Sequence, residues 1–92
     1  MTAKEMFENV KGNFWGVNFQ YKQLHDRTKI QYGLFFEYGL DSVITFCLDE
    51  KTTKITYLKS GNILVIKEES LERFSLSFRK AILKQWEELG WI

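Results

Sequence analysis

Alternating hydrophobic and polar positions predict β-strands through the middle of the chain. Apolar side chains recur at every second position in residues 14–22 and again in 29–38, and a two-residue period is typical of strands with one buried face. A nearly continuous apolar run at 43–48 predicts a central strand that is buried on both faces. Residues 54–59 and 63–67 contain many β-branched side chains and complete a set of about five strands.

Short connections between these strands determine how the strands pair. Polar or glycine-containing segments lie at 23–28, 39–42, 49–53 and 60–62, and they predict turns. Connections of this length are too short for a parallel crossover. Each strand is therefore expected to pair antiparallel with the next, in a meander.

The last third of the chain, Ser70–Ile92, has the period of an amphipathic helix. At about 100° per residue, its apolar side chains fall on one broad face and its charged side chains fall elsewhere. Gln85 is the one polar residue near the centre of the apolar stripe. This pattern predicts a long helix that covers one face of the sheet.

The sequence predicts one end point for this helix but leaves two possible starting points. Gly90 follows the last apolar residue and can adopt a positive φ, which predicts a Schellman motif that brings Trp91 back to Trp86. Ser70 is the favoured N-cap, because glutamates on both sides of it complement the positive end of the helix dipole. Ser77 is the alternative N-cap and would start a shorter helix.

A second, short helix is predicted at 2–11, where Thr2 and Glu5 have the spacing of a capping box and Gly12 follows as a stop. A helix of this length must dock on the rest of the protein to persist. The sequence thus predicts an α+β fold in which residues 1–92 form a single domain. An antiparallel sheet of about five meandering strands is covered by the long C-terminal helix, with the short N-terminal helix beside it or at an edge.

Composition and charge narrow the class of protein. The 92 residues are 45% hydrophobic and 16% aromatic and contain no proline, which suits one small domain with short turns. A net charge of +1 provides no overall field that would select nucleic acid or an anionic membrane. The single cysteine, Cys47, excludes an internal disulfide and indicates a reducing compartment. Because the sequence shows neither a signal peptide nor a membrane-length apolar run, we expect a cytoplasmic protein with no membrane partner.

Candidate catalytic residues are few. His25 lies next to Asp26, as in an acid–base pair, but no nucleophile neighbours them and a solvated hairpin loop is the better interpretation. Cys47 lies in the most apolar strand, where a small buried hydrophobe is expected rather than a reactive thiol. One histidine and one cysteine do not make a zinc site, and no phosphate-binding glycine motif occurs. We therefore expect no catalytic, cofactor-binding or metal-ligating residues, and no enzyme activity.

One candidate binding surface combines aromatic and basic side chains on the first strand and in the segment after it. Aromatic rings beside a basic rim are how proteins hold single-stranded nucleic acids. The same alternating aromatics are also what the core of a sheet requires, and this is the more frequent case. The candidate residues are Trp15, Phe19, Tyr21, Lys22, Arg27 and Lys29.

Some apolar residues lie off the faces that the pattern predicts to be buried. Leu76 and Leu83 share a side of the last helix that should face water, and Phe14 and Phe35 point away from the buried faces of their strands. Several such residues together indicate either a second covered face of the sheet or a surface for a partner.

Three segments carry a resemblance to known proteins: Thr2–Glu8, Ile44–Lys51 and the C-terminal helix Lys80–Trp91, with the sequence KAILKQWEELGW. They resemble small, mostly uncharacterised proteins encoded by phages and prophages of low-GC Gram-positive bacteria. The resemblance implies an accessory protein made inside a bacterial host. It also implies a last helix that begins near Phe78.

The resemblance leads to a hypothesis about function. Small phage proteins of this kind often bind a host protein and block it, as anti-CRISPR proteins do with defence nucleases. We therefore expect a non-enzymatic inhibitor of a host protein, such as a CRISPR or other defence nuclease, that acts by steric or surface mimicry. A single-stranded nucleic-acid-binding module stays open as the alternative, and a structural protein of the virion or a homodimer is a weaker third interpretation.

Overall fold

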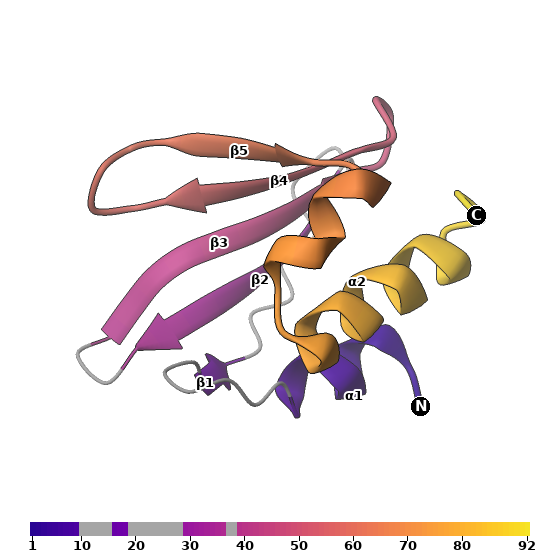
Figure 1. The fold of residues 1–92 in the computed structure, drawn as a ribbon, viewed down its shortest axis with the longest axis horizontal. Helices are drawn as coiled ribbons and strands as arrows, with labels where there is room; N and C mark the ends of the chain where they lie inside the picture. The colour runs from indigo at the N-terminus through magenta and orange to yellow at the C-terminus, as the bar shows by residue number, and fades with distance from the viewer. Residues whose placement is uncertain (10–15, 19–28, 37–38) are drawn as a thin grey trace.

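The computed structural model describes residues 1–9, 16–18, 29–36 and 39–92, and it shows an antiparallel sheet with helices packed against it (Figure 1). This arrangement confirms the predicted α+β fold. In chain order, the elements are α1 (Ala3–Glu8), β1 (Gly16–Asn18), β2 (Lys29–Phe36), β3 (Gly39–Cys47), β4 (Thr52–Tyr57), β5 (Ile63–Ile66), the 3₁₀ helix η1 (Glu68–Arg73) and α2 (Leu76–Glu88).

The strands follow one another across the sheet in chain order, and each pairs antiparallel with the next. The predicted meander is therefore confirmed. β1 contributes only three residues at one edge, so the longer strands β2 to β5 form the body of the sheet. β5 is the opposite edge, because it is bonded to β4 alone among the strands.

The turn predicted at 39–42 is wrong. β3 begins at Gly39, and its first residues pair with the end of β2. The ladder is irregular between Leu34 and Phe35, where the register shifts by one residue, and β3 begins before the expected turn would end. Glycine and aspartate in this segment have low strand propensity, but pairing with a neighbouring strand overrides such a preference.

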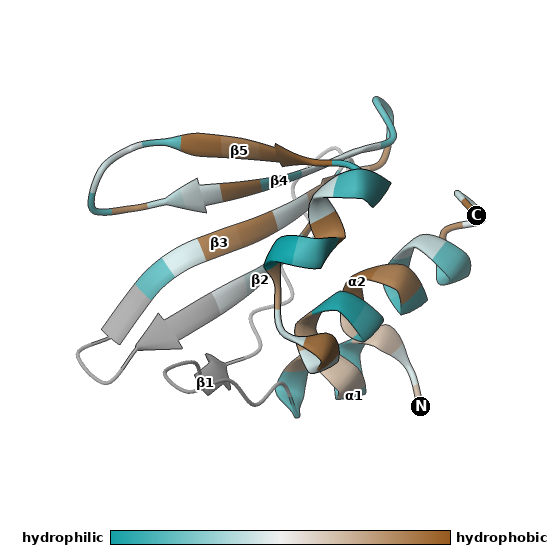
Figure 2. Ribbon diagram, viewed as in Figure 1, coloured by the Kyte–Doolittle hydropathy of each residue, from teal (hydrophilic) through white to brown (hydrophobic). Residues whose placement is uncertain are grey.

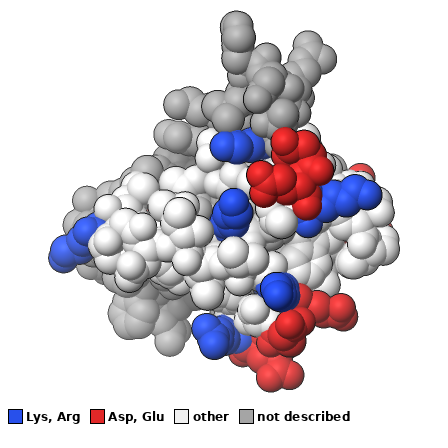
Figure 3. All heavy atoms as spheres, turned by 90° about the horizontal axis from the view of Figure 1, so that it is seen from above, with Lys and Arg blue, Asp and Glu red and all other residues white. Residues whose placement is uncertain are grey.

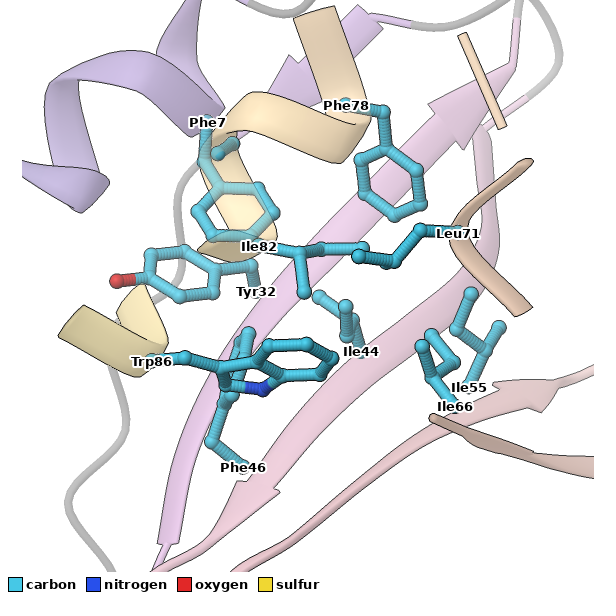
Figure 4. Close-up of a cluster of buried hydrophobic side chains, with 11 residues drawn as sticks. Phe7, Tyr32, Ile44, Phe46, Ile55, Ile66, Leu71, Phe78, Ile82 and Trp86 are labelled. Atoms are coloured by element: carbon cyan, nitrogen blue, oxygen red, sulfur yellow. The ribbon is translucent and has the colours of Figure 1, made fainter. Parts of the chain in front are cut away.

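The helices cover one face of the sheet and enclose the hydrophobic core (Figure 4). Alternate side chains of the strands point towards the helices, as Ile44 and Phe46 of β3 do. Phe78, Ile82 and Trp86 lie at helical spacing on α2 and supply the opposite side of the core. In Figure 2, hydrophilic residues lie on the outward turns of η1 and α2 and in the loops, whereas β3 and β5 are hydrophobic along much of their length.

The C-terminal helix is shorter than predicted, because the segment forms two helices. Ser70 lies inside η1, and Phe74 after it is extended, with φ −106° and ψ 159°. Ser75 is the N-cap of α2 and accepts a hydrogen bond of 3.4 Å from the backbone N–H of Phe78. The interruption lets Leu71 on η1 and Phe78 on α2 approach the core from different directions, and both are buried there.

The end of α2 forms the predicted Schellman motif. Gly90 has a φ of 75°, and its N–H donates to the carbonyl of Glu87 at 3.0 Å. The N–H of Trp91 donates to the carbonyl of Trp86 at 2.8 Å. These two bonds satisfy carbonyls that the end of the helix would otherwise leave unpaired.

The short α1 docks on the core and on α2. Its predicted capping box is present, with reciprocal hydrogen bonds between Thr2 and Glu5. Phe7 is fully buried and stacks on Tyr32 of β2, with ring centroids 4.1 Å apart. The N–H of Ala3 donates to the carboxylate of Glu88 at 2.7 Å, which ties α1 to the end of α2.

Candidate functional site

Of the six candidate binding residues, Lys29 lies within the described part of the chain. It starts β2, is half-buried and pairs with Cys47 of β3. His25 is not among the described residues. The remaining five candidates also lie outside the described residues: Trp15, Phe19, Tyr21, Lys22 and Arg27. The aromatic and basic surface therefore stays a prediction.

Two of the sequence-based predictions concern Cys47 and metal-ligating side chains in the described part of the chain. Cys47 is a buried free cysteine at the end of β3, as expected of a small core residue. Within the described ranges, no group of three or more His, Cys, Asp or Glu side chains is placed to hold a metal ion. In the same part of the chain, no helix is long and apolar enough to cross a membrane.

The face of the sheet opposite the described helices offers a more definite candidate. Side chains on this open face follow from the register, because residues paired across the ladder point to the same side. Two rows cross it, one through Gln31, Thr45, Lys54 and Val65 and the other through Val43, Thr56 and Ile63. We call these seven residues the open face.

The open face is mostly uncharged, and its apolar side chains become more exposed towards β5. Ile63 is 62% exposed and Val65 is 45% exposed, whereas Val43 is half-buried. Lys54 is the one charged member, and its ammonium lies 3.9 Å from the carboxylate of Glu50. Neighbouring exposed apolar side chains of this kind mark surfaces that another molecule covers.

A hydrogen bond orders the polar centre of the open face. The side-chain amide of Gln31 on β2 donates to the hydroxyl of Thr45 on β3 at 3.1 Å. Cross-strand pairs of this type stabilise a sheet and fix its side chains. Thr45 is buried, at 7% exposure, so the accessible part of the open face lies towards β5.

Ile63 is the first residue of β5 and follows the tight hairpin that joins β4 and β5. Tyr57 accepts a bond of 2.7 Å from the N–H of Gly61 and donates one of 2.8 Å to the carbonyl of Asn62. Gly61 has a φ of 76°, so the hairpin ends in a G1 bulge, which requires a left-handed residue at this position. Leu58 in the same turn is exposed and extends the apolar surface.

Acidic side chains lie around this region. Figure 3 looks down on the β5 side of the molecule, where uncharged atoms cover much of the middle with Lys or Arg groups among them, and acidic groups gather on the right and at the lower margin. β5 is followed by exposed Lys67 and then by exposed Glu68 and Glu69, and exposed Lys59 lies in the turn before it. An apolar centre with a charged rim is the usual arrangement of a protein–protein interface.

The exposure of Ile63 and Val65 was not predictable from the sequence. The four residues of β5 are all apolar, so their pattern does not indicate which side faces water. Of the residues that lay off the predicted buried faces, Leu76 is 59% exposed, as expected. Leu83 is half-buried and packs against the core.

Comparisons with protein-family models, with curated proteins and with solved structures found no match.

Proposed function

We propose that this chain is a non-enzymatic accessory protein of a phage or prophage that binds and inhibits a host protein through its open face. The observation that carries the proposal is the exposure of Ile63 and Val65 on a face that the described helices leave uncovered. The resemblance to phage proteins supports a CRISPR or other defence nuclease as the class of host protein that is bound. Steric blockage needs no catalytic group in the inhibitor.

The open face suits a protein partner better than a nucleic acid. Its exposed side chains are aliphatic, and its one charged member, Lys54, is next to a carboxylate. Binding of single strands depends on stacking aromatics and on basic groups that neutralise phosphates. Interfaces between proteins instead bury an apolar centre within a polar rim.

Plaque assays and capture from host lysate test the proposal. Expression of the wild-type protein should restore plaque formation on an immune host and leave a non-immune host unaffected. Ile63→Lys and Thr56→Lys should each weaken binding of the captured host protein by roughly tenfold or more, because a charge enters the apolar centre. Thr56 lies inside the sheet rather than at its edge, so its substitution tests the face itself.

Leu76→Lys is the matched control. Leu76 is 59% exposed, nearly as exposed as Ile63, but it lies at the start of α2. Its substitution should leave inhibition unchanged. Immunity that persists in the presence of the wild-type protein, or equal effects of the lysine at 63 and at 76, would contradict the proposal.

A further inference from the structure

We propose that the outer edge of β5, which no other strand in the described part of the chain pairs with, pairs antiparallel with the β5 strand of a second copy of this chain and joins the two sheets into one. The proposal goes beyond the binding of a host protein, because it concerns the backbone edge of β5 and needs no host component. Edge strands present unpaired N–H and C=O groups that another strand can bond.

The hydrogen bonds of the β4–β5 hairpin show which groups point outward. The carbonyl of Asn62 accepts from Tyr57, so the backbone of Asn62 faces β4. Backbone direction alternates along a strand, so Leu64 and Ile66 also face β4, and Ile63 and Val65 face away from it. The backbone N–H and C=O groups of Ile63 and Val65 therefore lie along the outer edge of the sheet.

One register of two antiparallel β5 strands uses all of these outward groups. Ile63 of each copy then lies opposite Val65 of the other, and the two Leu64 residues meet on the symmetry axis. Each Ile63–Val65 pair exchanges two hydrogen bonds, and every side-chain pair at the centre is apolar. The strand from Ile63 to Ile66 has no lysine, proline or bulge, which are the features that protect many edges from such pairing.

Charge complementarity supports the same register. Lys59 lies before β5, and Glu68 and Glu69 come after it, separated from the strand by Lys67; all four residues are exposed. An antiparallel arrangement with two-fold symmetry brings the Lys59 end of each copy to the Glu68 and Glu69 end of the other. Lys67 then lies opposite Gly61, so no like charges face each other.

Pairing would also enlarge the open face. The side chains of Ile63 and Val65 stay on that face, and those of the second copy come to lie beside them. A dimer would thus present one continuous apolar surface in place of two small ones. Because only a short strand is paired, we expect reversible association rather than an obligate dimer.

Sedimentation velocity over a range of protein concentration tests the dimer directly. The purified wild-type chain should change from monomer to dimer as its concentration rises from low micromolar to several hundred micromolar. Lys59→Glu should weaken the dimer roughly five- to tenfold at low salt, because both symmetric pairs are lost. Adding Glu68→Lys and Glu69→Lys to this variant should restore the affinity, since the charges are then exchanged rather than removed.

A second pair of variants separates backbone pairing from simple apolar contact. Val65→Pro removes an outward N–H without removing a bond to β4, and it should abolish the dimer. Val65→Thr keeps this N–H and the β-branched shape, and it should retain most of the association. Near-ultraviolet circular dichroism checks that both variants are folded.

Three results would overturn the proposal: a wild-type chain that stays monomeric over the whole range, a folded Val65→Pro variant that still forms the dimer, or a charge exchange that fails to restore affinity. A charge exchange that fails to restore affinity overturns the proposal even if the Val65→Pro variant does not fold. These measurements use the purified chain alone. A failure here is therefore distinct from a failure of host inhibition, which is tested with Thr56→Lys.

Discussion

The indole of Trp86 on α2 donates a buried hydrogen bond of 2.7 Å to the hydroxyl of Thr53 on β4. The Trp86 ring lies within the core cluster, beside Phe46 in Figure 4. This bond therefore joins the helical layer to the sheet at a place where water cannot replace the hydroxyl.

Thr53→Val should lower the free energy of unfolding by about 1–3 kcal/mol, because the change leaves a buried indole N–H without its acceptor. Valine has nearly the same shape, so little of the loss would come from packing. Chemical denaturation followed by tryptophan fluorescence measures the effect. Thr56→Val on the same strand is the control and should change stability by no more than about 0.5 kcal/mol, since Thr56 lies on the open face. Equal losses at the two positions would show that the hydrogen bond is not responsible.

A second buried bond, 2.5 Å long, joins the hydroxyl of Tyr32 on β2 to the side-chain carbonyl of Gln85 on α2. A double-mutant cycle with Tyr32→Phe and Gln85→Met should reveal a coupling of about 1 kcal/mol. Loss of both polar groups together should cost less than the sum of the single changes, because either single change already removes the hydrogen bond between them. Additive losses in urea denaturation would contradict this account.

Gln85 shows how far the sequence alone could lead. Its place within the apolar stripe of the last helix was clear from the helical period, and the structure buries it there. The partner was not predictable, because Tyr32 lies 53 residues away and meets it only through the packing of α2 on β2. The hydrophobic period and the residue propensities indicate which face of a helix or strand is buried. The contacts between distant elements depend on how those buried faces pack together.

The candidate site shows the same limit. The alternating strands and the final glycine were sufficient to predict the meander and the Schellman motif. The sequence did not reveal the exposed edge of β5, because a strand of four apolar residues has no alternation. The period of the last segment favoured one continuous helix from Ser70, whereas the chain is extended at Phe74 and α2 starts after its N-cap, Ser75, two residues before the alternative cap Ser77.

Ser75→Ala should lower the free energy of unfolding by about 0.5–2 kcal/mol, because the first turn of α2 loses its N-cap. Ser77→Ala should have an effect within about 0.5 kcal/mol, since Ser77 already lies inside the helix, where alanine is favourable. Thermal or urea denaturation of the two variants compares them directly. A larger loss at Ser77 than at Ser75 would place the start of α2 later than the structure does.

The capping box of α1 predicts a dependence of stability on pH. Hydrogen bonds from the backbone N–H and the hydroxyl of Thr2, 2.9 and 3.0 Å long, hold the pKa of the Glu5 carboxyl below its ordinary value. Because the pKa is lower in the folded state, the ionised Glu5 stabilises the fold above the unfolded pKa. This stabilisation is lost as the pH falls through the folded pKa.

Glu5→Gln should remove that part of the pH dependence while it keeps the capping geometry, because glutamine also serves in a capping box. The stability difference between wild type and Glu5→Gln should therefore be largest near neutral pH and shrink below about pH 4. Urea denaturation at a series of pH values measures the difference, and an NMR titration of the Glu5 side chain measures its pKa. A Glu5 pKa at or above its ordinary value, or a difference that grows in acid, would show that the capping box does not form in solution.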